Sequence, residues 1–118
     1  MKKNHALAAL AALAQDNRLD VFRLLVEAGR EGMPAGAVAD ALKLAPNTLT
    51  FHFDRLREAG LVTVRRDGRS MIYAARYDTM NALLGYLTEN CCRGQADQCR
   101  PVASAGSATK ARQKEPVS

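Results

Sequence analysis

The chain has 118 residues and a formal net charge of +5, with 47% hydrophobic and 25% charged residues, which is typical of one ordinary globular domain. No apolar run approaches the roughly 20 residues that a membrane-spanning helix needs, so we expect no membrane partner. The Ala- and Leu-rich start is followed at once by Asp16, Arg18 and Asp20, which argues against a signal peptide and predicts a cytoplasmic protein.

Hydrophobic periodicity divides the chain into helices and one pair of strands. In the first helix Leu7, Leu10 and Leu13 recur at every third residue, with alanines around them, and form a narrow apolar stripe. Asp16 is the predicted N-cap of the second helix, and Gly29 is its predicted stop. The predicted helices span 5–14, 16–28, 35–42, 47–59 and 78–89, and the predicted strands span 61–66 and 69–74.

The predicted fold is mainly α with a β-hairpin, arranged as a winged helix-turn-helix. Pro34 and Pro46 open the third and fourth helices, and residues 43–46 between these helices form the short turn that the motif requires. Asp67-Gly68 between the strands indicates a type I′ turn. The hairpin is therefore the predicted wing.

The fourth helix is the predicted DNA-reading helix, because one face can be buried while the other stays free for the major groove. Leu49, Phe53 and Leu56, at positions i, i+4 and i+7, form its inward stripe. Phe51 suits contact with thymine methyls, and core packing is the alternative. For His52 we expect a phosphate contact or a packing hydrogen bond rather than metal ligation. The predicted DNA-contacting residues of this helix are Asn47, Thr48, Thr50, Phe51, His52 and Arg55.

The predicted wing is rich in arginine. Residues 55–76 contain six arginines against Glu58 and Asp67, and guanidinium groups fork onto phosphate oxygens. We therefore predict phosphate contacts from Arg65, Arg66 and Arg69. A solvated hairpin with ordinary surface charge, or a winged helix that binds protein, is the alternative. The chain shows no Gly-rich phosphate loop and no nucleophile motif beside its two histidines, so we do not expect an enzyme.

The composition changes near Arg100. Residues 100–118 are rich in Ala, Ser, Lys and Gln and predict a disordered tail, which leaves residues 1–99 as the DNA-binding and dimerisation domain. Just before the tail stand all three cysteines, at positions 91, 92 and 99. An odd number of closely spaced cysteines is not the framework of a secreted scaffold. It indicates ligand or redox chemistry in a reducing compartment.

Residues 44–62, LAPNTLTFHFDRLREAGLV, resemble the recognition-helix signature of the ArsR/SmtB metal-sensing repressors. Residues 17–21 and 69–73 resemble the opening of that family's second helix and its wing. The resemblance implies a homodimer, joined through the first and last helices, that binds double-stranded operator DNA and releases it when an inducer binds. The apolar stripes of these two helices have no partner in the predicted reading unit, which agrees with this role.

Cys91, Cys92 and Cys99 resemble the C-terminal three-thiol arsenite site of one subgroup of that family. The family also places metal ligands in two other segments, which correspond here to residues 35–42 and to the last helix. Residues 35–42 hold no thiol, and the last helix holds no His. Trivalent arsenic binds three thiolates in a trigonal pyramid, whereas Zn²⁺ prefers four ligands. The expected inducer is As(III), Sb(III) should bind as well, and no permanent cofactor is expected.

Convergence of three sulfurs on one ion requires the last helix to end near Cys92. In an unbroken helix Cys92 and Cys99 would lie about 10 Å apart along the axis, and Gly94 is the predicted place where the chain folds back. We expect ligation within one subunit, with ligation across the dimer as the alternative. A thiol redox or persulfide switch, inert cysteines, or another soft ion such as cadmium or lead also stay open.

Overall fold

The structure, a computed structural model, describes residues 1–94, so Cys99 and the predicted tail lie outside the described residues. The chain divides into two units, Met1–Leu87 and Thr88–Ser118. The first unit holds the elements of the predicted winged helix, and the described part of the second contains a short 3-10 helix, Cys91–Gly94. No helix within residues 1–94 is both long and apolar enough to cross a bilayer.

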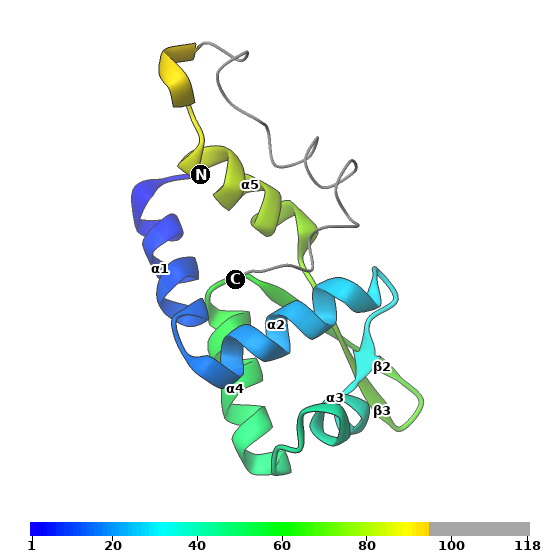
Figure 1. Cartoon of the computed structure of the whole chain (residues 1–118). Coiled ribbons are helices and arrows are strands. Elements are labelled where there is room, and N and C mark those ends of the chain that lie inside the picture. The colour runs from blue at the N-terminus through cyan, green and yellow to red at the C-terminus, as the bar shows by residue number, and fades with distance from the viewer. Residues whose placement is uncertain (95–118) are drawn as a thin grey trace, which may run out of the picture. The chain divides into compact units, whose positions relative to one another are not determined.

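The helices of the first unit follow the predicted order, and the winged helix-turn-helix is confirmed (Figure 1). Each helix begins and ends within two residues of its predicted bounds. α3 and the start of α4 lie at the end of this unit that is remote from the start of α1 (Figure 1). The helices are α1 (Lys3–Leu13), α2 (Asp16–Ala28), α3 (Ala35–Leu42), α4 (Pro46–Glu58) and α5 (Tyr77–Leu87).

The N-cap of α2 is Gln15, so the prediction of Asp16 is wrong. The Gln15 Oε1 accepts a hydrogen bond of 2.9 Å from the backbone N–H of Arg18, one of the first-turn donors that lack a partner inside a helix. Asp16 stands in the first turn instead, where a negative charge interacts favourably with the helix dipole. Gly29 ends the helix as predicted, with φ at +87°.

The sheet contains a strand that the sequence analysis missed. β2 (Val62–Asp67) and β3 (Ser70–Ala75) form the predicted hairpin, and β1 (Met33–Pro34) pairs with the other edge of β3, so that the antiparallel order is β1-β3-β2. A strand of two residues is too short to show alternation. Gly32, with φ at +77°, precedes it, and a Cβ there would collide with the carbonyl oxygen of Tyr73. Glycine is therefore needed where this strand approaches β3.

The hairpin turn is not the predicted type I′ turn on Asp67-Gly68. Asp67 pairs with Ser70, which leaves Gly68 and Arg69 as the two turn residues. Gly68 has φ at +64°, whereas Arg69 is not among the non-glycine residues with positive φ. Positive φ at the first turn residue and negative φ at the second is the φ pattern of a type II′ turn, which places glycine first.

The core of the first unit is built from α2, α3, α4 and the hairpin, with α1 packed against it. α1 contributes its alanines: Ala6, Ala9 and Ala12 are buried, whereas Leu7 and Leu10 are 57% and 39% exposed. Small side chains allow a helix to approach its neighbours closely, so the alanine face points inward. Of the predicted leucine stripe, Leu7 and Leu10 are therefore left outside the core, whereas the half-buried Leu13 packs against it. The largest fully buried side chains are Val21, Leu25, Val38, Phe53, Leu56 and Leu61.

Candidate nucleic-acid interface

α4 presents one buried and one exposed face, as predicted. Leu49, Phe53 and Leu56 are at most 2% exposed, so the inward stripe is confirmed. The opposite face carries short polar side chains, one aromatic ring and one guanidinium, which are groups that bind base edges and phosphates. The exposed members of the predicted DNA-contacting set are Asn47, Thr48, Thr50, Phe51 and Arg55.

Two of these exposed side chains make contacts along α4. The Thr50 hydroxyl donates to the carbonyl oxygen of Pro46 at 3.0 Å, which leaves the methyl group and the oxygen lone pairs available. Arg55 pairs with Glu58 at 2.9 Å, and both side chains are at least half exposed. Exposed pairs of this kind contribute little to stability, so Arg55 can exchange Glu58 for a phosphate.

Phe51 lies on the surface of α4 and not in the core, because 51% of the residue is exposed. The guanidinium of Arg55 lies 5.0 Å from the centre of its ring, and that of Arg18 lies 6.0 Å from it. Both distances are within the range of cation–π attraction. Sequence reasoning did not assign Arg18 to the site. A weak signal is that Phe22, and not an acidic residue, stands four residues further along the helix, so Arg18 has no ion-pair partner at that spacing.

His52 is the one member of the predicted set that the structure places inside, at 4% exposure. It therefore does not lie on the exposed face of α4. Among the described residues neither ring nitrogen has a hydrogen-bond partner, so the expected packing bond is absent there as well. Burial, followed by the positive charge of Arg18, lowers the pKa of His52 below its ordinary value. The neutral ring is thus favoured.

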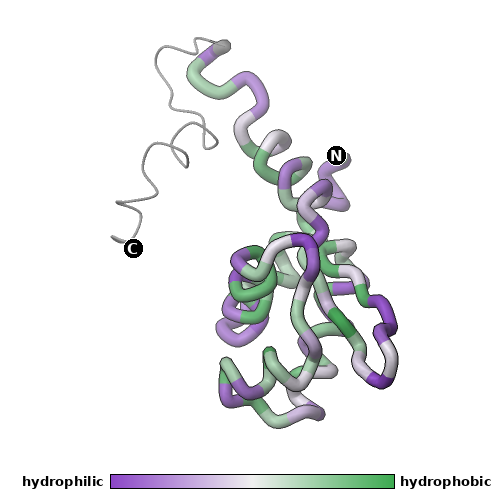
Figure 2. The backbone as a smooth tube through the Cα atoms, turned by 90° about the vertical axis from the view of Figure 1, so that its right-hand side faces the viewer, coloured by the Kyte–Doolittle hydropathy of each residue, from purple (hydrophilic) through white to green (hydrophobic). Residues whose placement is uncertain are grey.

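The wing carries its arginines at and near its turn, where the chain is hydrophilic (Figure 2). Arg65, Arg66 and Arg69 are all exposed, as a phosphate-binding role requires. Arg65 has a further contact that the sequence analysis missed: its Nη1 donates to the backbone carbonyl of Glu31 at 3.1 Å. This bond holds Arg65 beside the segment that leads into β1.

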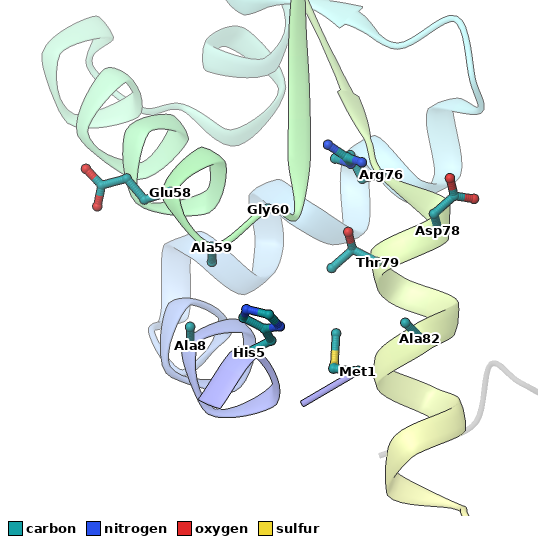
Figure 3. A pocket seen from close by; sticks show the side chains of 10 residues that line it. All are labelled: Met1, His5, Ala8, Glu58, Ala59, Gly60, Arg76, Asp78, Thr79 and Ala82. Carbon is teal, nitrogen blue, oxygen red and sulfur yellow. The ribbon is translucent and has the colours of Figure 1, made fainter. Parts of the chain in front are cut away.

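A pocket of about 470 Å³ lies between α1, the end of α4 and the start of α5 (Figure 3). His5 points from α1 into this space, with Thr79 of α5 across from it (Figure 3). The pocket is lined by charges of both signs, Glu58 and Asp78 against Arg76. In the part of the chain that is described, no three His, Cys, Asp or Glu side chains gather as metal ligands.

The predicted inducer residues begin just after α5. α5 ends at Leu87, and Asn90, Cys92 and Arg93 adopt positive φ angles between 54° and 58°. The chain therefore does not run through Cys91 and Cys92 as a continuous helix. Cys91 is exposed and Cys92 is half-buried.

The fold and the exposed face of α4 beside an arginine-rich hairpin define a winged helix-turn-helix protein. A family described as a helix-turn-helix domain matches residues 13–65. The HTH-type transcriptional regulator YceK of Bacillus subtilis is 36% identical over 77 residues, which cover 64% of this chain and 76% of YceK. The chain therefore belongs to the HTH-type transcriptional regulators.

Solved structures of ArsR-like regulators share its fold. An ArsR-like regulator from Rhodococcus sp. RHA1 superposes with a TM-score of 0.63 at 24% identity, covering 90% of this chain and 93% of that one. The homodimeric winged helix-turn-helix domain of Mb0332 from Mycobacterium bovis, a possible ArsR-family regulator, superposes with a TM-score of 0.60 at 23% identity, covering 79% and 86%.

Proposed function

We propose that this chain is a transcriptional repressor that binds double-stranded operator DNA as a homodimer. The observation that carries the proposal is the surface formed by α4 and the wing: five of the predicted DNA-contacting side chains of α4 are exposed, and three exposed arginines stand in the hairpin. In this arrangement α4 reads bases in the major groove, while the wing arginines neutralise phosphates.

The dimeric state is supported by apolar surface that the described chain leaves uncovered. Leu7 and Leu10 of α1 and Leu87 of α5 are 57%, 39% and 55% exposed. Between α2 and α5 lies an apolar groove of about 470 Å³, lined among others by Leu19 and Met80. Exposed apolar surface of this kind marks interaction sites, and the related Mb0332 domain is homodimeric. A second copy that covers α1 and α5 would hold two α4 helices at one fixed spacing.

The proposed inducer is As(III), or Sb(III) by the same chemistry, held by Cys91, Cys92 and Cys99. The proposal is supported by the end of α5 at Leu87 and by the left-handed residues that follow it, because a continuous helix would keep the sulfurs apart. Three thiolates neutralise a trivalent ion completely, so the loaded site carries no net charge. Soft thiolates also favour a soft ion.

Induction follows from linkage between the inducer site and the DNA surface. An inducer that draws Cys99 towards Cys91 and Cys92 reorders the chain that follows α5. α5 itself belongs to the proposed dimer interface. The two reading helices then lose the spacing that fits two half-sites. Operator affinity falls by the coupling free energy, typically about 1–3 kcal/mol.

Titration of arsenite into a protein–DNA complex tests the whole proposal. The DNA is a duplex selected from a random pool by the wild-type protein under full reduction. We expect arsenite to release the DNA from wild type and to leave the Cys99→Ser complex intact, while both proteins bind DNA equally well without arsenite. Failure to select any duplex would refute DNA binding. Release by peroxide or persulfide alone would refute the metalloid inducer and favour a redox switch.

A further inference from the structure

Arg18, which has no part in the proposed contacts, ties the end of α1 to the start of α2. Its Nε donates to the backbone carbonyl of Ala12 at 2.7 Å. Ala12 lies in the last turn of α1, where carbonyl groups have no partner inside the helix, and a cation there also suits the helix dipole. The backbone N–H of Arg18 donates to the side chain of Gln15, so both the backbone and the side chain of Arg18 are fixed.

The other end of the same guanidinium reaches α4. Its central carbon lies 6.0 Å from the centre of the Phe51 ring, and its charge contributes to the lowered pKa of the neighbouring His52. The rings of Phe51 and His52 themselves meet edge to face at 5.8 Å. Arg18 is half-buried, so this contact is partly shielded from water and stronger than an exposed one.

We propose that Arg18 is a positioning residue for DNA recognition: it couples the C-terminal end of α1 to Phe51 and so fixes the orientation of that ring on the DNA-facing side of α4. The inference rests on the proposed DNA-binding function and adds a residue to it. Its consequence is a direct connection between the helix whose leucines form the proposed dimer surface and the helix that reads bases.

The chemistry of the site requires arginine. A planar guanidinium can donate through Nε to a carbonyl while its face or edge lies against an aromatic ring, whereas the single ammonium of lysine cannot reach both partners in a fixed geometry. Arg23, one and a half turns further along α2, provides the contrast. It is largely exposed, and its ion pair with Glu27 on its own helix is long, at 3.9 Å.

The test measures affinity for a duplex selected by the wild-type protein from random-sequence DNA. We expect Arg18→Met to weaken binding about tenfold, which corresponds to about 1.4 kcal/mol, and the matched control Arg23→Met to change it less than twofold. Arg18→Lys keeps the charge, and we expect an affinity between those of wild type and Arg18→Met. Wild-type affinity in either Arg18 variant would overturn the inference. Should Arg18→Met fail to fold, Arg18→Lys alone decides.

A double-mutant cycle separates positioning from a purely structural role. In a Phe51→Leu background we expect Arg18→Met to cost less than a further twofold in affinity, because the ring that it orients is gone. A full tenfold loss in that background would overturn the inference, as would a reduced salt dependence showing that Arg18 binds phosphate itself. If wild type selects no duplex, the proposed function fails. If wild type selects a duplex but the effects of Arg18→Met and Phe51→Leu simply add, only the proposed role of Arg18 is refuted.

Discussion

The rings of Phe53 and Tyr73 stack in parallel, with centroids 3.6 Å apart and planes 5° apart. Phe53 belongs to α4, and Tyr73 belongs to β3 of the wing, so one aromatic contact joins the two parts of the proposed DNA surface. Phe53 is 1% exposed, and the stack is therefore shielded from water. This contact fixes the distance between the recognition helix and the hairpin.

Phe53→Ala should lower the free energy of unfolding by about 3–5 kcal/mol, because it removes a buried ring and leaves a cavity. Urea denaturation followed by circular dichroism measures the change. The matched control is Phe51→Ala on the exposed face of the same helix, for which we expect a loss of about 1 kcal/mol or less. Equal losses in the two variants would contradict the arrangement of α4.

Alanine substitutions at Gly32 and at Gly36 give a second matched pair of variants. Gly32→Ala should lower the free energy of unfolding by roughly 1–3 kcal/mol, because φ is +77° and the new methyl group meets the carbonyl oxygen of Tyr73. Gly36→Ala should raise it by roughly 0.5–1 kcal/mol, since Gly36 lies inside α3 with open space around its Cβ position. Thermal denaturation of both variants decides the signs. A neutral Gly32→Ala would show that β1 does not approach β3.

Buried His52 should make stability depend on pH. Its folded-state pKa is lowered, so below about pH 6.5 the unfolded state binds a proton that the folded state does not. The free energy of unfolding therefore has its full value above that pH, as far as His52 is concerned, and declines as the pH falls below it. Urea denaturation at several pH values should show a steeper decline for wild type than for His52→Leu. His5→Leu, at an exposed position, should lose stability with falling pH as steeply as wild type. An equally steep loss in His52→Leu would show that buried His52 is not its cause.

The wing arginines should act on DNA without regard to sequence. Arg66→Ala removes one proposed phosphate contact, so the slope of log affinity against log salt should fall by about one. The loss should be similar for selected and random duplexes. Fluorescence anisotropy titrations at several salt concentrations measure both quantities. Arg23→Ala on α2 is the control, and an unchanged slope in Arg66→Ala would remove the wing from the interface.

The exposed leucines of α1 should hold the proposed dimer together. Leu7→Glu places a charge on a residue that is 57% exposed, so the protomer should fold normally while dimerisation weakens, because a buried unpaired charge is costly. Sedimentation equilibrium should show a shift towards monomer. Met71→Glu, on a wing strand and 42% exposed, should leave self-association unchanged. A monomeric wild type, or an unaffected Leu7→Glu dimer, would exclude this face.

The helices could be predicted to within two residues because Pro34, Pro46 and Gly29 mark three of their ends and apolar residues recur at helical spacing. The inward stripe of α4 follows from its spacing alone. β1 could not be predicted, since two residues contain no pattern, and its existence depends on pairing with β3 across the fold. The hairpin turn also shifted by one residue, because strand pairing decides which residues remain for the turn.

Local sequence was thus enough to determine which segments are helical, which face of α4 is buried and where positive charge accumulates, since propensity, periodicity and charge are properties of neighbouring residues. Tertiary packing decided that three alanines of α1 face the core while Leu7 and Leu10 do not, that His52 is enclosed while Phe51 is exposed, and that Arg18 bridges two helices. These outcomes depend on which elements approach one another and how closely, and that information is shared between segments far apart in the chain.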